Sequence, residues 1–324
     1  MSIQIVVLGG GTGTSTVLRG LRKIDGMELT AIVSVADSGG SSGLKRKQHL
    51  VLPPGDLKEA FLALSKLPKE LLDLLAYRFH SGQEQGDTLG NLILTASEEM
   101  FGDVGTSMKH LHVLFQIEGR VIPVSYTAED LCALLEDGTV LEGEEEIDRP
   151  SRTSRNPIES CYLNPAVEAC TDAIEAIKKA KVLILGPGDL FSSTAPVLLT
   201  TGIREAIINS EAQLLYIMNL VTHHRQTSLY SAGDHLRKIT QYVGRRFDHV
   251  LINNTPFPAE AIARYAAAKE QPVVDDLPQR SDIVRADLLS IVLQEPVAGD
   301  ILQRSLIRHD FDKLAKAILS VIQL

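Results

Sequence analysis

Short apolar runs alternate with amphipathic segments along most of the chain. The apolar runs are four to seven residues long and nearly continuous, as in strands of a parallel sheet that is covered on both faces. The strands predicted in this way are residues 3–8, 29–35, 182–185, 214–219 and 249–252. The segments between them have helical spacing. The helices predicted are residues 14–23, 56–66, 88–100, 165–180, 203–209, 231–243 and 258–269.

This alternation predicts the α/β fold class. We expect a Rossmann-like, mostly parallel sheet with helices on both faces and right-handed crossovers. Asn164-Pro165 marks the start of the helix over 165–180, with Asn164 as its cap and Pro165 in its first turn. A last helical pattern covers 311–322, within a tail that we interpret either as a homodimer element or as a lid on the core.

One stretch, residues 119–163, interrupts the alternation. It holds the short apolar runs 121–124, 131–135 and 139–141, and Asp137-Gly138 between the last two predicts a hairpin. The acidic run 142–148 and the polar run 149–157 are predicted to form a solvated hairpin edge and a mobile loop. We interpret 119–163 as a β-hairpin excursion inside a single domain of residues 1–324. A linker between two domains is the alternative.

Composition narrows the function classes. Apolar residues make up 44% of the chain, as in ordinary globular proteins, and the net charge of −9 argues against a broad nucleic-acid surface. Three cysteines without a C-x-x-C pair, Cys132, Cys161 and Cys170, are typical of buried thiols in a reducing compartment. No signal peptide and no apolar run long enough for a bilayer is visible, so we expect a cytoplasmic protein without membrane insertion.

Glycine-rich turns directly follow the first two predicted strands. The strand over 3–8 runs into Gly9-Gly10-Gly11-Thr12-Gly13, and the strand over 29–35 runs into residues 37–43. Bare glycine backbone and a helix N-terminus favour binding of a phosphate, and parallel strands bring such turns to one edge of the sheet. We therefore predict a nucleotide site there. The residues predicted to contact the ligand are Gly9, Gly10, Gly11, Thr12, Gly13, Asp37, Ser38, Gly39, Gly40, Ser41, Ser42, Asn91, Gly186, Pro187 and Gly188.

These residues are assigned different parts of the ligand. Gly10–Gly13 and Gly39–Ser42 are expected at the phosphates, Asp37 and Asn91 at the ribose, the base or a metal, and 186–188 on the opposite wall. The first turn is not a G-x-G-x-x-G fingerprint, because threonine occupies the last position in both frames. The basic run 45–49 either neutralises a pyrophosphate or forms a solvated turn.

Three further candidates have alternative interpretations. Asp56 either caps a helix or shares a divalent cation, such as Mg²⁺, with Asp37. Gly39-x-Ser41-x-Gly43 fits a nucleophile elbow, but the residues after it are too polar for a helix packed on a sheet. His223-His224 is predicted to be a polar loop at the end of a strand, because no third metal ligand has suitable spacing.

Six ordered blocks carry a resemblance to a known family. They resemble the CofD-like superfamily, and within it the YvcK-type branch of bacterial gluconeogenesis factors, relatives of 2-phospho-L-lactate transferase. Two residues differ from the branch: Ser38 stands where a second aspartate is usual, and Leu44 where an arginine is usual. Residues 222–227 also depart from its usual Thr-Gln-Pro-Gly-Glu-Thr. The blocks are Val7–Gly13, Val33–Gly43, Pro53–Asp56, Leu89–Leu92, Leu185–Gly188 and Ser231–His235.

The resemblance implies a function. The superfamily's named enzyme moves a phospholactyl group from a guanosine diphosphate carrier to a deazaflavin, whereas the YvcK-type branch is associated with UDP-sugar binding, cell shape and growth on gluconeogenic carbon sources. We expect a regulatory protein that binds a nucleotide or UDP-sugar. The alternative is a metal-dependent transferase in which Asp37 and Asp56 hold the divalent ion, with GDP as the nucleotide. An NAD-dependent oxidoreductase is a third possibility, and no catalytic residue is assigned.

Overall fold

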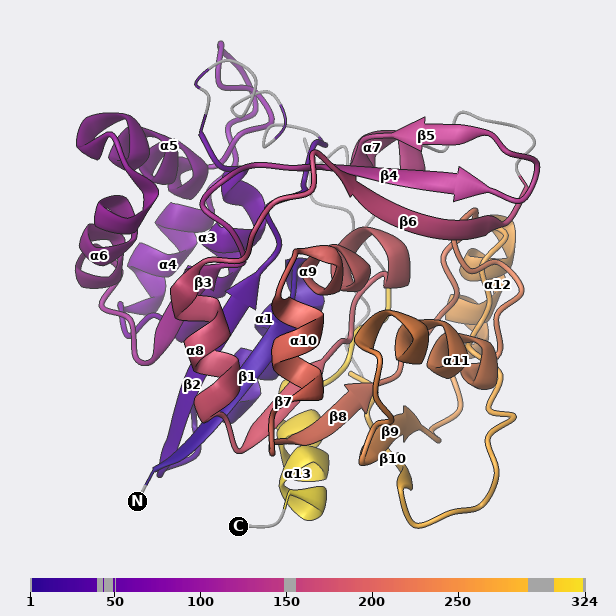
Figure 1. The fold of residues 1–324 in the computed structure, drawn as a ribbon. Helices are drawn as coiled ribbons and strands as arrows, with labels where there is room; N and C mark the ends of the chain where they lie inside the picture. Colours follow the sequence, from indigo (N-terminus) through magenta and orange to yellow (C-terminus); the bar gives the residue numbers. More distant parts are fainter. Residues whose placement is uncertain are drawn as a thin grey trace.

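Seven parallel strands form the central sheet, in the order β10-β9-β8-β7-β1-β2-β3 (Figure 1). The computed structural model describes residues 2–39, 43, 49, 51–148, 156–290 and 306–322. The strands are β1 (Ile3–Gly9), β2 (Met27–Val33), β3 (Arg120–Pro123), β7 (Val182–Leu185), β8 (Gln213–Ile217), β9 (His249–Asn253) and β10 (Ile283–Ala286). The α/β class and all five predicted strands are confirmed.

The two edge strands differ from the prediction. The apolar run at 121–124, assigned to the excursion, instead contributes β3, which pairs with β2. The other edge strand, β10, was not predicted, because it has only four residues and one of them is charged. Its Arg285 binds Asp275 at 2.6 Å, so the charged side chain is satisfied at the sheet edge.

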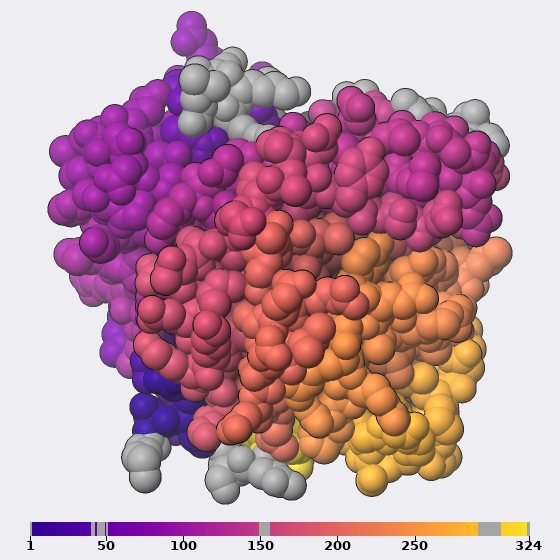
Figure 2. Space-filling view, in the orientation of Figure 1, coloured from indigo at the N-terminus to yellow at the C-terminus, as the bar shows by residue number. Residues whose placement is uncertain are grey.

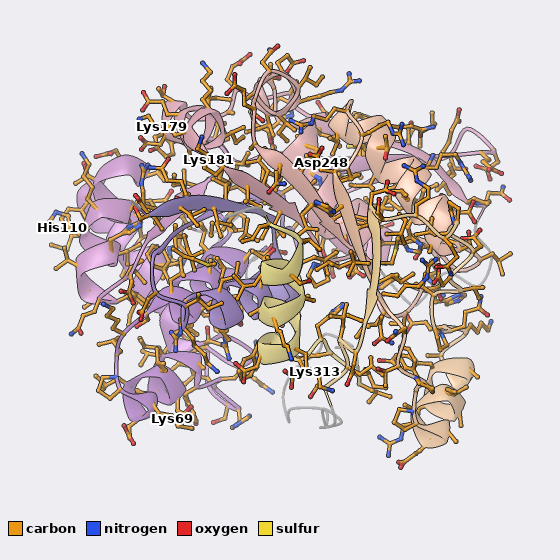
Figure 3. The ribbon with its side chains drawn as sticks, turned by 90° about the horizontal axis from the view of Figure 1, so that it is seen from below. Lys69, His110, Lys179, Lys181, Asp248 and Lys313 are labelled. Atoms are coloured by element: carbon orange, nitrogen blue, oxygen red, sulfur yellow. The ribbon has the colours of Figure 1, made fainter. Side chains whose placement is uncertain are left out.

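Helices cover both faces of the sheet. Seen from below, α13 with Lys313 and α4 with Lys69 lie on one side, and α8 with Lys179 lies on the other (Figure 3). The α-helices are α1 (Gly11–Leu21), α3 (Pro54–Leu64), α4 (Lys69–Ala76), α5 (Leu89–Phe101), α6 (Val104–Leu114), α7 (Glu144–Asp148), α8 (Thr171–Lys179), α9 (Ala195–Leu199), α10 (Ile203–Ile208), α11 (Ala232–Val243), α12 (Ala259–Ala267) and α13 (Phe311–Val321). A π-helical turn, η1 (Leu190–Thr194), precedes α9.

One predicted helix start is wrong. Asn164 does not cap a helix, because it pairs with Asp130 as the last residue of a strand in a second sheet. The Asn164–Pro165 peptide is cis, and α8 begins only at Thr171, with Cys170 in the N-cap position. At the other end of the chain, α13 packs on α1, where Gly20 leaves room for the backbone of Phe311.

A three-stranded antiparallel sheet lies across one end of the central sheet (Figure 1). It consists of β4 (Asp130–Leu135), β5 (Val140–Glu142) and β6 (Ile158–Asn164), and the predicted Asp137-Gly138 turn joins β4 to β5. Its inner face forms an apolar cluster with Ala36, after β2, and Phe191, after β7. The space-filling view shows this segment in contact with the later half of the chain (Figure 2). The small sheet therefore covers loops at the carboxyl edge.

The prediction of a solvated acidic edge at 142–148 is right for Glu142 and Glu145, which are exposed, but wrong for the segment as a whole. Residues 144–148 form α7, whose Ile147 is completely buried in the small sheet's apolar cluster. Glu144 consequently turns inward, and residues 149–155 of the predicted mobile loop lie outside the described residues. Cys132, Cys161 and Cys170 are buried free thiols, as predicted. In the described ranges, every helix is too short or too polar to span a bilayer.

Candidate ligand site at the carboxyl edge of the sheet

The first glycine turn, residues 9–13, follows β1 in the middle of the central sheet. Strand β1, buried over its last five residues, pairs with β2 on one side and with β7 on the other, so the strand order reverses beside it. Open α/β sheets bind ligands at such a reversal, outside the carboxyl ends of the strands. Gly10 is the N-cap of α1, and Gly11 has a φ of +66° that favours glycine. The predicted turn therefore opens a helix at the expected place.

The first and the last predicted glycine turns touch. A Cβ atom on Gly13 would lie 2.0 Å from the backbone oxygen of Pro187, so only glycine allows this approach. Gly186 has a φ of +74°, and the Gly188 N–H donates to Oδ1 of Asn219 at 3.3 Å. The structure thus brings 9–13 and 186–188 together from β1 and β7.

Asp56 lies directly against the first turn. It is in the first turn of α3, and its Oδ2 would be 2.0 Å from a Cβ atom on Gly10. Its carboxylate accepts a hydrogen bond from the Gly11 N–H. The hydroxyls of Thr14 and Thr16 donate to the carbonyls of Gly10 and Thr12. Several polar groups of the predicted phosphate site therefore already form hydrogen bonds within the protein.

Asp37 shapes the loop after β2, and Ser38 connects that loop to α7. Oδ1 of Asp37 accepts from the Gly39 N–H at 2.9 Å, and Oγ of Ser38 accepts from the Glu145 N–H at 3.3 Å. A Cβ atom on Gly39 would lie 2.9 Å from Oε2 of Glu144. The acidic helix α7 therefore lies beside the second glycine turn. Gly40, Ser41, Ser42 and the basic residues 45–47 fall outside the described residues.

Carboxyl groups converge at this edge, where burial and neighbouring negative charges raise the pKa of Asp56, Glu144 and Asp189. Burial and then the charge of Asp37 raise the pKa of Asp56 to about 7. Burial, followed by Asp148 and Asp37, raises the pKa of Glu144 well above its ordinary value. Burial also raises the pKa of Asp189, to which Asp148 contributes. Neutral and charged carboxyl groups therefore coexist here near pH 7.

His223 follows β8 and faces these carboxylates. Burial lowers its pKa, but Asp189, Asp148 and Glu270 together outweigh burial and raise it. Nearby, the amide nitrogen of Gln226 donates to Asp148 and, at 3.0 Å, to Oγ of Ser192. Sequence reasoning did not assign Glu144, Asp148 or Gln226 to the site. Gln226 could have been found from its position, because residues 223–226 follow the carboxyl end of β8, where α/β sheets bind ligands.

Asn91 occupies a different place. It is buried in the first turn of α5, where its N–H donates to Oγ1 of Thr88 at 3.2 Å. The adjacent Gly90 lies against Lys58 of α3. Asn91 is thus connected to the glycine turns through α3, and its assignment to the ribose or the base stays a prediction.

The predicted metal pair is brought together. The charge of Asp37 reaches Asp56 strongly enough to raise its pKa. Two carboxylates fit Mg²⁺, which usually keeps several waters and takes its other ligands from a phosphate. Over the described ranges, no set of three or more His, Cys, Asp or Glu side chains is arranged to hold a metal. Such an ion would therefore need oxygen ligands from a bound phosphate or from water.

Comparison with known proteins identifies the family. Residues 5–294 match the family described as 2-phospho-L-lactate transferase CofD. The chain belongs to the CofD family. It is 34% identical over 323 residues to the "Gluconeogenesis factor" of Bacillus subtilis, covering 99% of this chain and 98% of that one. It is 36% identical over 323 residues to the "Gluconeogenesis factor" of Listeria monocytogenes, with 98% and 95% covered.

A solved structure shares the CofD-family fold. The crystal structure of a UPF0052 family member from Bacillus halodurans superposes with a TM-score of 0.89 at 34% identity, covering 98% of this chain and 100% of that chain. The resemblance to CofD-like proteins and to gluconeogenesis factors is confirmed. The candidate site of this protein combines two touching glycine turns with the acidic side chains Asp37, Asp56, Glu144, Asp148 and Asp189. Carboxylates accept hydrogen bonds from sugar hydroxyls, whereas a phosphate at α1 requires a neutral or cation-bound Asp56.

Proposed function

We propose that this protein binds a nucleotide sugar, with UDP-sugars as the first candidates, and acts as a regulator rather than as a catalyst. The observation that carries the proposal is the contact between Gly13 and Pro187, which joins two glycine turns at the reversal of strand order. A helix N-terminus and bare backbone suit a pyrophosphate there. The carboxylates of Asp37, Glu144 and Asp148 suit the hydroxyls of ribose and sugar.

The relatives support a regulatory role. Similar proteins over nearly the whole chain carry the name gluconeogenesis factor. A protein that senses a sugar-nucleotide pool would connect central carbon metabolism with cell-envelope synthesis, and hence with cell shape and growth on gluconeogenic carbon sources.

A metal-dependent transferase is the second candidate, and one observation favours it. Asp37 and Asp56 repel each other at the glycine turn, and a divalent cation would relieve that repulsion while bridging phosphates. In this case Asp37 and Asp56 would hold the ion, which would stabilise negative charge on the transferred phosphoryl group. The family's description as 2-phospho-L-lactate transferase agrees with this chemistry.

Calorimetric titration separates the candidates. The protein is titrated with UDP-N-acetylglucosamine, GDP and NAD, each with and without Mg²⁺, and the ligand is recovered and analysed. Metal-independent binding of the UDP-sugar, recovered intact, supports the regulator. Binding of GDP only with Mg²⁺ supports the transferase. Binding of NAD alone would contradict both proposals.

A further inference from the structure

Gln226 joins three segments at the carboxyl edge of the central sheet. It lies in the loop after β8 and is only 3% exposed. Its side-chain amide nitrogen donates to Asp148 of α7 and, at 3.0 Å, to Oγ of Ser192 in η1. The orientation of the amide is therefore fixed, because a reversed amide would place its carbonyl oxygen against a carboxylate.

The carbonyl end of the same amide has no partner. Oε1 of Gln226 is buried and accepts no hydrogen bond from the described residues. A buried acceptor without a donor is destabilising, and in native structures it calls for a partner from outside the chain. Oε1 and the amide nitrogen that contacts Asp148 are bonded to one carbon atom. A group that binds beside Gln226 therefore meets an amide oxygen and a carboxylate together, and both accept hydrogen bonds.

Acidic side chains continue from this point to the second glycine turn. Asp148 and Glu144 are one turn apart on α7 and share a hydrogen bond. Burial, followed by the charges of Asp148 and Asp37, raises the pKa of Glu144 well above its ordinary value, so the proton of this pair lies between its own two carboxyl groups near pH 7. A Cβ atom on Gly39 would lie 2.9 Å from Oε2 of Glu144. Helix α7 thus extends from the predicted phosphate position to Gln226.

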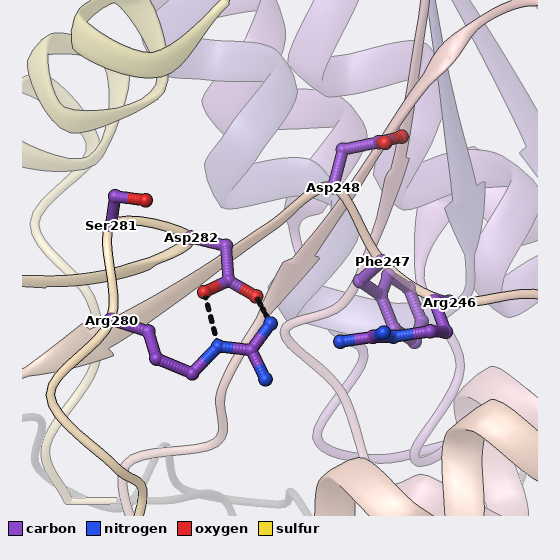
Figure 4. Close-up of a pocket in the computed structure, with 6 residues that line it drawn as sticks. All are labelled: Arg246, Phe247, Asp248, Arg280, Ser281 and Asp282. Carbon is purple, nitrogen blue, oxygen red and sulfur yellow. Dashed lines mark hydrogen bonds and ion pairs between the residues drawn. The ribbon is translucent and has the colours of Figure 1, made fainter.

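An acidic group at the opposite edge of the sheet has a different environment. At the amino end of β10, Arg280 binds both oxygens of Asp282, at 2.9 and 2.7 Å (Figure 4). In the described part of the chain, Asp148 and Glu144 form no such pair with an arginine or lysine, and His223 is the cation that faces Asp148. A further negative charge brought to α7 would therefore be repelled.

We infer that this end of the site binds the sugar of the nucleotide sugar as a neutral group, through hydroxyl or amide N–H donors, and discriminates against a sugar that carries a carboxylate. Gln226 and Asp148 are the residues that determine this specificity. A neutral sugar donates hydrogen bonds to both, whereas a uronate presents acceptors to acceptors and adds a negative charge. The inference rests on the proposed function, because a pyrophosphate at the glycine turns places the attached sugar within reach of α7.

The test uses UDP-glucose, UDP-xylose and UDP-glucuronate in calorimetric titrations. These ligands differ only at the C6 position, which carries a hydroxymethyl group in the first, is absent in the second and is a carboxylate in the third. UDP-glucuronate should bind about tenfold or more weakly than either neutral ligand, because like charges repel. UDP-glucose controls for the size of the group, and UDP-xylose controls for the loss of its hydroxyl donor.

Two variants locate the discrimination. Asp148→Asn keeps an acceptor for the Gln226 amide but removes the charge, and it should reduce the preference for UDP-glucose over UDP-glucuronate about fivefold or more. The matched control Asp282→Asn removes a carboxylate at the opposite edge and should leave this preference unchanged. Gln226→Leu removes the free acceptor and should weaken UDP-glucose binding about fivefold to tenfold. Thermal melting checks that each variant is folded.

The outcomes separate this inference from the proposed function. UDP-glucuronate binding as tightly as UDP-xylose, or an unchanged preference in Asp148→Asn, would overturn the inference alone. An unchanged UDP-glucose affinity in folded Gln226→Leu would show that Oε1 is satisfied by a water only, and would overturn it as well. Binding of none of the UDP-sugars would overturn the proposed function, and the inference with it.

Discussion

The carboxylate of Asp56 accepts a hydrogen bond from the backbone N–H of Gly11, at the start of α1. An acidic side chain of the protein thus occupies the position where a helix N-terminus would bind a phosphate. With a pKa of about 7, Asp56 exchanges its proton in the physiological range. Entry of an anionic ligand is therefore coupled to the protonation of Asp56 or to its neutralisation by a cation.

Replacing Asp56 with asparagine should stabilise the free protein at alkaline pH. The folded pKa of about 7 lies above the ordinary 3.8, so ionisation destabilises the folded state, and this cost disappears as the pH falls from about 7 to about 4. We expect Asp56→Asn to raise the free energy of unfolding by roughly 4 kcal/mol at about pH 8 and by little at about pH 4. Urea unfolding across this pH range measures it. Exposed Glu260→Gln is the control, and an equal gain at both pH values would refute the coupling.

Asp37 should control both ligand binding and the titration of Asp56. We expect Asp37→Ala to abolish nucleotide-sugar binding and to lower the pKa of Asp56, because the charge that raises it is gone. Carboxyl NMR titration and calorimetry measure the two effects. Asp37→Asn keeps the acceptor for the Gly39 N–H, and so separates lost charge from lost loop geometry. Nucleotide-sugar affinity that survives in both variants would place the ligand elsewhere.

Gly11 is a less specific probe of the same site. Its φ of +66° is strained for any residue with a Cβ atom. We therefore expect Gly11→Val to lose ligand binding together with about 1–2 kcal/mol of stability. Thermal melting and calorimetry of the same sample test this, and Gly26→Val, at φ +81° on an open turn, controls for strain alone. Retention of full stability in Gly11→Val would show that the turn adapts to a side chain.

His223 should make stability depend on pH in the opposite sense to Asp56. Its pKa is raised above 6.5 in the folded protein. Its contribution to the free energy of unfolding is therefore fully present below about pH 6.5 and is lost as the pH rises through the folded pKa. His223→Gln should therefore cost more stability at about pH 6 than at about pH 9. Unfolding curves at both values, with exposed His110→Gln as the control, test this. A cost that is independent of pH would mean that His223 contributes only packing.

Phe191 should be critical for the attachment of the small sheet. It is fully buried among residues from the small sheet and from the loops beneath it, and its ring lies 6.4 and 6.5 Å from the rings of Tyr230 and Tyr242. Phe191→Ala should cost about 3–5 kcal/mol and weaken ligand binding, since α7 moves with the small sheet. Leu229→Ala, at an 86% exposed position, should change stability by less than about 0.5 kcal/mol. Equal effects of the two substitutions would argue against this attachment.

The central strands and most helices could be predicted because their patterns are local. Five mostly buried strands appear in the sequence as nearly continuous apolar runs, and Asp137-Gly138 specified its hairpin. The edge strand β10 was not predicted, because a short, half-exposed strand with an arginine lacks that pattern. Asn164 misled because it is the last residue of β6, paired with Asp130 of β4, and α8 begins only at Thr171.

The glycine turns could be predicted, but the grouping of acidic side chains beside them could not. A glycine cluster after a strand is a local signal, and strand order brings such turns to one edge. Glu144, by contrast, lies in an acidic run that resembles a solvated loop. It faces Gly39 only because the small sheet folds back over the carboxyl edge and buries Ile147. Such a placement depends on tertiary packing, which no local pattern encodes.

The position of β1 has a consequence for dynamics. All seven of its residues pair with β2, and four of them also pair with β7, so its amides should be among the last to exchange with solvent. The turn from Gly9 to Gly13 is therefore anchored to a part of the chain that opens only with global unfolding. A ligand that binds this turn meets a backbone already fixed before it arrives, and little conformational entropy is left to lose there on binding.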